Sequence, residues 1–188
     1  VVTKSPLTGM IACSNSGGVW GAILKYAGWD AVIVEGKADA PVYLEINDDN
    51  VVLHDASDLW GKRTLDVEAT LKERHEGSSV LNIGPAGENQ ALLAAIMNDG
   101  DRAAGRSGVG AVMGSKKLKA IVVTPTNRNA DQTLASAEAL KEANKAAMVN
   151  IKENGLTSEG LRALGTACLV NVINSVGALP VRNWQDSH

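Results

Sequence analysis

The residues best suited to bind an anion lie between positions 99 and 123, in the segment DGDRAAGRSGVGAVMGSKKLKAIVV. Glycine turns expose backbone N–H groups, and arginine presents a planar fork of donors, so the combination favours a phosphate or pyrophosphate. The alternative is a glycine-rich hairpin whose charges are only solvated. The basic residues that would form the phosphate cradle are Arg102, Arg106, Lys116, Lys117 and Lys119.

Two familiar nucleotide motifs do not fit this segment. Its glycines imitate a dinucleotide-binding fingerprint, but only about eight residues separate Gly110 from the strand expected at Lys119. That spacing is too short for the helix of a βαβ unit. A P-loop requires the order Gly-Lys-Ser/Thr, whereas Ser115 precedes Lys116 here.

A second candidate is SNSGGVWG, residues 14–21, which precedes a predicted helix. The free amides of a helix N-terminus attract an anion. The alternative is capping, in which Ser14, Asn15 or Ser16 satisfies those amides without a ligand. A third glycine segment, GPAGEN at 84–89, is interpreted as a tight turn with Glu88 in the first turn of the next helix.

The histidines and cysteines offer weaker candidates. His54, His75 and His188 lack the spacing of a metal site and are expected at the surface. Cys13 and Cys168 lie in apolar surroundings and are expected to be packed thiols. Two cysteines exclude a disulfide-dense scaffold, and they exclude a zinc or iron–sulfur site made by this chain alone.

These segments must be positioned by the elements of an α+β fold. Short β-branched runs predict strands, and an apolar period near 3.6 residues predicts helices. Thr64 is the expected N-cap of a helix whose Leu65 and Leu71 tend toward one face. Strands are predicted at 31–36, 41–47, 50–56, 79–84 and 119–123, and helices at 19–27, 64–76 and 89–97, with a loop over 102–114.

After residue 123 the pattern changes. The polar connector TPTNRNADQT leads into a purely helical sequence, which predicts a domain boundary near 126 and domains at 1–126 and 127–188. Helices are expected at 136–154, 158–164 and 166–176, each followed by a glycine.

Composition narrows the class of protein. Of the 188 residues 45% are hydrophobic and 21% charged, which is typical of a globular chain and excludes a disordered one. The net charge of −3 provides no basic field for nucleic acid or a membrane surface, so neither is an expected partner. No membrane span or signal peptide is evident, which predicts a cytoplasmic location. Val1 is not a start methionine, and we expect both ends to be cuts in a longer protein.

Longer motifs run through most of the chain. They are VTKSPLTG at 2–9, SNSGG through AGWDA to IVEGKA at 14–38, the Trp60-Gly61-Lys62 turn, IGPAGEN at 83–89, IMNDGDRAAGR through LKAI at 96–121, and GTACLVNVINSVGALPVRNWQ at 165–185. In this order they resemble the tungsten-dependent aldehyde:ferredoxin oxidoreductase family.

The resemblance implies a fold and an activity. The fold is the family's N-terminal domain, truncated, in which two β-sheets related by a pseudo-twofold axis lie against a tungsten bis-pterin cofactor; the start of a helical domain follows. Enzymes of this family oxidise aldehydes to carboxylic acids with water as the oxygen source. They pass two electrons through a 4Fe-4S cluster to ferredoxin. A small aldehyde and ferredoxin are therefore the implied partners, and a homodimer is left open.

The resemblance also implies site residues, although it identifies no catalytic residue. By motif match, the cofactor phosphates and a bridging Mg²⁺ are expected at Asn15, Ser16, Gly17, Arg102 and Ala103. The backbone carbonyls of Asn15 and Ala103 are the expected Mg²⁺ ligands, since Mg²⁺ prefers hard oxygen donors.

Some family features differ or are absent. Ser107 and Lys117 stand where the family usually has Gly and Asn, and neither Cys13 nor Cys168 matches a cluster ligand. The 4Fe-4S cluster therefore belongs to the full-length protein, and this chain alone is expected to be inactive. Molybdenum in place of tungsten, a related reductase reaction, and a pyrophosphate-, nucleotide- or pterin-binding module without redox chemistry all stay open as alternatives.

Overall fold

The computed structural model describes residues 1–127 and 134–186, and the chain divides into two compact units, Val1–Gln132 and Thr133–His188. The predicted assignment of the two parts to a cofactor-binding and a helical domain stays a prediction. No helix in the described ranges is long and apolar enough to cross a membrane.

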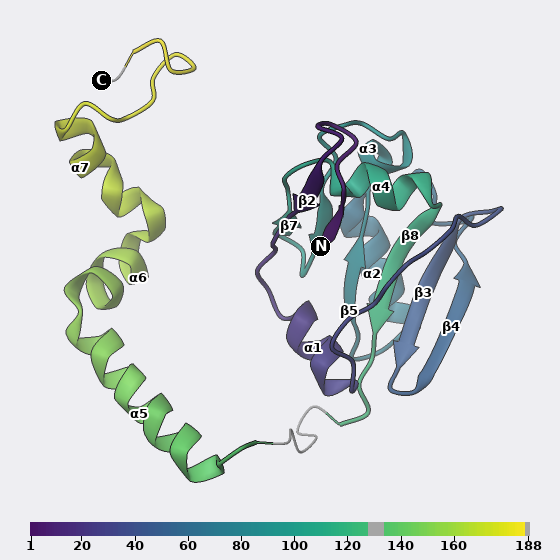
Figure 1. Ribbon diagram of the computed structural model, residues 1–188, viewed down its shortest axis with the longest axis horizontal. Coiled ribbons are helices and arrows are strands. Elements are labelled where there is room, and N and C mark those ends of the chain that lie inside the picture. The colour runs from purple at the N-terminus through teal and green to yellow at the C-terminus, as the bar shows by residue number, and fades with distance from the viewer. Residues whose placement is uncertain (128–133, 187–188) are drawn as a thin grey trace. The chain divides into compact units, whose positions relative to one another are not determined.

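A mixed six-stranded sheet forms the centre of the first unit, in the order β4-β3-β8-β5-β6-β7 (Figure 1). β3 and β4 form an antiparallel hairpin, and β8 runs parallel to β3 and antiparallel to β5. All six residues of β8 are buried, as expected of a central strand covered on both faces. The strands are β3 (Val42–Asn47), β4 (Asn50–Asp55), β5 (Ser79–Asn82), β6 (Ile96–Asn98), β7 (Arg102–Ala104) and β8 (Leu118–Val123).

Helices cover both faces of this sheet. On one face α2 buries Val67 and Leu71 in a cluster with Val122, and on the other α1 and α4 contribute to a cluster around Ile121. Burial of each such side chain contributes roughly 1.5 to 3 kcal/mol to the free energy of folding. The helices are α1 (Trp20–Tyr26), α2 (Thr64–Arg74), α3 (Pro85–Glu88) and α4 (Val109–Ser115).

A second, two-stranded sheet joins β1 (Val2–Lys4) to β2 (Ile11–Cys13), with Val2 opposite Cys13 in an antiparallel pair. The expected α+β class with two sheets is therefore confirmed. The two sheets are unequal in size. Ser5 connects this small sheet to the rest of the unit, because its hydroxyl donates to the carbonyl of Ser107 at 2.9 Å.

The second unit is helical. Ser136 caps its longest helix by accepting a hydrogen bond from the Ala139 amide at 3.1 Å. The helices predicted at 158–164 and 166–176 are divided into shorter turns of different pitch. In chain order the elements are α5 (Ala137–Glu153), the π-helical turn η1 (Leu156–Gly160), α6 (Leu161–Leu164), the 3₁₀ turn η2 (Gly165–Leu169) and α7 (Val170–Ser175).

Two predictions based on short apolar runs are wrong. Residues 31–36 form no strand; the Lys116 ammonium donates to the carbonyl of Gly36 at 2.9 Å and holds this segment as a loop. Residues 89–97 form no helix and end in β6, while α3 begins earlier, at Pro85, whose fixed φ suits the first helical turn. Short apolar runs do not distinguish strand from helix by their period.

Other predictions need smaller corrections. The predicted loop over 102–114 contains β7 and α4. Arg63, not Thr64, occupies the N-cap position of α2. Leu65 is 62% exposed, whereas Leu71 is buried as expected.

Candidate functional site

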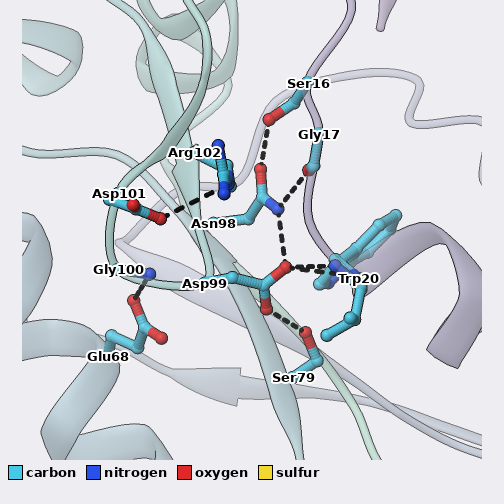
Figure 2. Close-up of polar contacts among 11 residues, drawn as sticks. Ser16, Gly17, Trp20, Glu68, Ser79, Asn98, Asp99, Gly100, Asp101 and Arg102 are labelled. Carbon is cyan, nitrogen blue, oxygen red and sulfur yellow. Dashed lines mark hydrogen bonds and ion pairs between the residues drawn. The ribbon is translucent and has the colours of Figure 1, made fainter. Parts of the chain in front are cut away.

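Two segments that are far apart in the sequence, 14–18 and 98–106, lie against each other in the first unit. The backbone N–H of Arg106 donates to the Ser14 hydroxyl at 3.1 Å. A Cβ atom placed on Gly17 would lie 3.7 Å from Cδ of Arg102. The structure thus brings the Asn15–Gly17 and Arg102–Ala103 predictions into one neighbourhood, shown in part in Figure 2.

Asn98, at the end of β6, connects the two segments. Its side-chain oxygen accepts from the Ser16 hydroxyl at 2.5 Å, and its side-chain nitrogen donates to the Gly17 carbonyl at 3.0 Å (Figure 2). Asn98 itself is only 2% exposed, whereas Ser16 and Gly17 are exposed, so the bonds run from a buried side chain to the surface segment. Sequence reasoning missed this residue, and its one signal was a polar side chain directly after an apolar run.

Asp99 occupies the N-terminus of α1. Its carboxylate accepts from the amides of Val19 at 2.6 Å and Trp20 at 3.2 Å, and from the Ser79 hydroxyl at 3.0 Å. Burial opposes the charge of Asp99, but the hydrogen bonds from Val19, Asn98, Ser79 and Trp20 outweigh it and lower the pKa of this carboxyl.

Both sequence interpretations of the α1 N-terminus therefore need correction. An external anion is not required there, because Asp99 already bonds its first amides. Capping by Ser14, Asn15 or Ser16 is not observed either. Helix α1 receives its cap from a residue 79 positions away in the sequence.

Gly18 permits this close approach of the two segments. Its φ is +91°, and a Cβ atom there would lie 2.2 Å from Oδ2 of Asp99 and 2.7 Å from Nδ2 of Asn98. Any larger residue would combine a strained backbone with a clash. The second glycine of the SNSGG motif is thus explained by contact within the chain.

The outer side of the two segments offers an open set of donors and acceptors. Arg102 forms an ion pair with Asp101, with 3.4 Å between Nε and Oδ1, but the two side chains are 57% and 79% exposed. Such exposed pairs contribute about 0 to 1 kcal/mol, so a stronger anion can replace Asp101. Arg106, Asn15 and Ala103 are also exposed.

This donor set fits a phosphate with a hard cation. An exposed guanidinium supplies a fork of donors, and the absence of a side chain at Gly17 and the small methyl group of Ala103 leave room for phosphate oxygens near the backbone. Asn15 makes no hydrogen bond to another residue among those described. No hydrogen bond joins it to Ala103 within the same ranges, but the bonds of Ser14, Ser16 and Asn98 hold together the two segments that carry these residues.

The three lysines of the predicted cradle lie elsewhere, which is a correction. Lys116 and Lys117 donate to the carbonyls of Gly36 at 2.9 Å and Asp39 at 2.6 Å, and thereby hold the loop before β3. Lys119 is fully buried. The basic part of the site is therefore reduced to the two arginines.

Lys119 pairs with Glu88 inside the first unit, with side-chain exposures of 0% and 4%. The ammonium also donates to the carbonyl of Lys62 at 3.0 Å, and the carboxylate accepts from the Gly61 amide at 2.8 Å. Burial lowers the pKa of Lys119, and Glu88 counteracts this effect. Glu88 lies in the first turn of the short helix α3, in agreement with the prediction of a first-turn acid, and its carboxylate also holds the Trp60-Gly61-Lys62 turn.

The glycines of α4 serve packing, not phosphate binding. A Cβ atom on Gly114 would lie 1.9 Å from the carbonyl oxygen of Gly87, at the contact between α4 and α3. This contact explains why the segment only imitates a nucleotide-binding fingerprint.

Two histidines belong to a polar cluster at β3, β4 and the end of α2. Glu45 contacts His54 at 2.6 Å and His75 at 3.1 Å, and the Tyr43 hydroxyl lies 3.1 Å from Nε2 of His75. The surface prediction is wrong for His75, whose side chain is 12% exposed. Burial raises the pKa of Tyr43. The described residues contain no group of three or more ligands suited to a metal ion.

The two cysteines differ in their exposure. Cys13 is exposed on β2, which contradicts a packed thiol, and Cys168 is half-buried in η2. His188 lies outside the described residues. An apolar cavity of about 330 Å³ opens between α1, α4 and β8, but its lysine, Lys116, is already bonded to Gly36.

Known proteins resemble this chain in sequence. Residues 1–125 match a family model described as the N-terminal domain of aldehyde ferredoxin oxidoreductase. The chain is 52% identical over 187 residues to the tungsten-containing aldehyde ferredoxin oxidoreductase of Pyrococcus horikoshii, covering 98% of this chain and 30% of that protein. It is 34% identical over 206 residues to the WOR-like subunit of an aliphatic sulfonate oxidoreductase of Pyrococcus furiosus, covering 100% of this chain and 32% of that one.

A solved structure is also similar. It is the active site complex BamBC of benzoyl coenzyme A reductase in complex with 1,5-dienoyl-CoA. The TM-score is 0.76 at 40% identity, covering 80% of this chain and 23% of that chain. The chain thus spans about 30% of the length of the curated relatives it matches.

Proposed function

The chain belongs to the aldehyde ferredoxin oxidoreductase family, and from this premise we propose that it is the cofactor-binding part of a tungsten enzyme that oxidises aldehydes to carboxylic acids. Ferredoxin is the proposed electron acceptor. When bound, a tungsten bis-pterin cofactor supplies the metal centre and the redox chemistry. This chain contributes segments 14–18 and 98–106, together named the phosphate clamp, which bind the cofactor phosphates.

The contact between these two segments is the observation that carries the proposal. A single loop would hold one phosphate, whereas two facing loops suit a pair of cofactors. Arg102 donates its guanidinium N–H groups to phosphate oxygens in place of its weak pair with Asp101. Ser16 and Gly17 provide a small, polar edge opposite that guanidinium.

A magnesium ion would complete the clamp. The carbonyl oxygens of Asn15 and Ala103 are hard donors on exposed residues, which suits Mg²⁺ that also binds phosphate oxygens. The 4Fe-4S cluster is proposed for another part of the complete protein, because Cys13 and Cys168 are the only cysteines of this chain and a cubane cluster takes about four ligands.

Tungsten and pterin content of the complete protein tests this proposal. A charge-assisted hydrogen bond contributes about 1.5 to 3 kcal/mol, so Arg102→Ala should weaken cofactor retention roughly tenfold or more. Arg102→Lys should recover only part of the cofactor retention that Arg102→Ala loses, since an ammonium lacks the guanidinium fork. Arg63→Ala, which removes an 83% exposed arginine at the start of α2, is the matched control and should retain normal content.

Two results would contradict the proposal. Normal tungsten and pterin content in folded Arg102→Ala would exclude the clamp. Wild-type protein that binds a pterin or diphosphate but contains neither tungsten nor iron would favour a binding module without redox chemistry.

A further inference from the structure

We infer that Asn98 and Asp99 are the positioning residues of the phosphate clamp: they set the direction of its two segments without touching the cofactor. This inference rests on the proposed function. It assigns a role to two residues that the sequence motifs alone did not single out as site residues.

Asn98 ties the position of Arg102 to the opposite segment. In the antiparallel pair of β6 and β7, Asn98 lies directly opposite Arg102. The side chain of Asn98 then reaches across to the Ser16 hydroxyl and the Gly17 carbonyl. One buried side chain therefore fixes both sides of the clamp relative to each other.

The bond to Gly17 also fixes a carbonyl direction. Nδ2 of Asn98 holds the Gly17 oxygen turned toward β6, at 3.0 Å. A carbonyl oxygen repels phosphate oxygens, so turning it inward removes an unfavourable contact from the face of the clamp. The amide of Asn98 suits this purpose, because it carries a donor for the Gly17 carbonyl and an acceptor for the Ser16 hydroxyl in one planar group.

Asp99 caps α1, the helix that follows segment 14–18. It begins the turn between β6 and β7 in a left-handed conformation, with φ of 49°. Its carboxylate bonds the amides of Val19 and Trp20, and it also accepts from Asn98 at 3.0 Å. A phosphate is thereby denied these amides and must bind on the side of Arg102.

The test compares cofactor retention with stability in the complete protein. Tungsten and pterin content, their half-lives of release, and melting temperatures with and without cofactor are measured for Asn98→Ala, Asp99→Ala and Asp99→Asn. Val67→Ala, a core truncation in α2, is the control that lowers stability without touching the clamp. Arg102→Ala tests the proposed function separately.

Loss of a supporting residue typically weakens ligand binding roughly 10- to 100-fold, and we expect this range for Asn98→Ala and Asp99→Ala. Asp99→Asn should retain most of the cofactor, because its amide oxygen can face α1 while its nitrogen donates to Ser79. Val67→Ala should release cofactor at the wild-type rate despite a lower melting temperature. The cofactor-dependent rise in melting temperature should shrink in Asn98→Ala and Asp99→Ala but not in Val67→Ala.

Two outcomes would overturn the inference. If Asn98→Ala and Asp99→Ala lose only as much cofactor as Val67→Ala, while Arg102→Ala loses much more, the clamp stands and its positioning residues are wrong. If Asp99→Asn loses as much cofactor as Asp99→Ala, a side chain of this shape with a hydrogen-bonding oxygen is not what supports the clamp at position 99. Normal retention in Arg102→Ala would instead reject the proposed function itself.

Discussion

At the residue scale, the pair Lys119–Glu88 shows the cost of a charge inside the first unit. Both side chains are almost fully buried, and each also bonds the backbone of the 61–62 turn. Glu88→Leu leaves an unpaired buried ammonium, which should cost about 3 to 5 kcal/mol of unfolding free energy. Urea denaturation should show that adding Lys119→Met recovers part of this loss. If the losses of unfolding free energy from Glu88→Leu and Lys119→Met simply add in the double variant, the pairing of the two charges is contradicted.

Asp99 predicts a specific dependence of stability on pH. Its pKa is lowered in the folded protein, so the stability it contributes is fully present above its unfolded pKa of 3.8 and is lost as the pH falls below that value. Asp99→Asn should therefore have a flatter acid limb in urea midpoints measured from pH 6 to pH 2.5, about the range of carboxyl titration. An unchanged acid limb would show that Asp99 does not stabilise the fold through its charge.

Some of these residues were predictable and others were not. Arg102 stands out in the sequence because glycines and a second arginine surround it, and the structure leaves it exposed beside segment 14–18. The lysines were misjudged, since spacing along the chain does not show that Lys119 points inward at the bulge where β8 meets β3. Asn98 gave almost no signal, because its partners in the other segment, Ser16 and Gly17, are more than 80 positions away.

At the element scale, the contact between α3 and α4 depends on the absence of a side chain at Gly114. A Cβ atom there would meet the Gly87 carbonyl, which is backbone and cannot rotate away. Gly114→Ala should destabilise the first unit by about 1 to 3 kcal/mol or more through overpacking.

Gly21→Ala is the control for this prediction. Position 21 lies in α1 with nothing within 4 Å of the added Cβ atom, so alanine should stabilise by about 0.5 to 1 kcal/mol through helix propensity alone. Urea midpoints of the two variants should therefore move in opposite directions. A shift of the same sign in both would contradict the close approach of α3 and α4.

Elements with a strong pattern were predictable. The buried strand β8, the hairpin of β3 and β4 around its polar turn, and helix α2 match their predictions closely. The segment 31–36 looked like a strand because its β-branched residues have a high local β propensity. Whether such a segment pairs with a neighbouring strand depends on the arrangement of the whole sheet, which local propensity does not show. Helix α4 was missed because its glycines lower helix propensity, and packing against α3 compensates for this.

At the scale of the whole molecule, the two units differ in their cores. Every residue of β8 is buried, whereas no residue of the described range 134–186 is buried. Protection from hydrogen exchange follows burial and cooperative packing. In this chain, exchange measured by mass spectrometry should be much slower for the amides of β8 than for those of α5. Equal protection would contradict the difference in packing between the units.

The most direct test of the phosphate clamp is a crystal structure of the complete, tungsten-loaded protein. The clamp predicts a cofactor phosphate within about 2.7 to 2.9 Å of the Arg102 guanidinium, as in charge-assisted hydrogen bonds. It also predicts a cation about 2.0 to 2.1 Å from the carbonyl oxygens of Asn15 and Ala103. Cofactor phosphates bound away from both segments, with the pair of Arg102 and Asp101 intact, would contradict it.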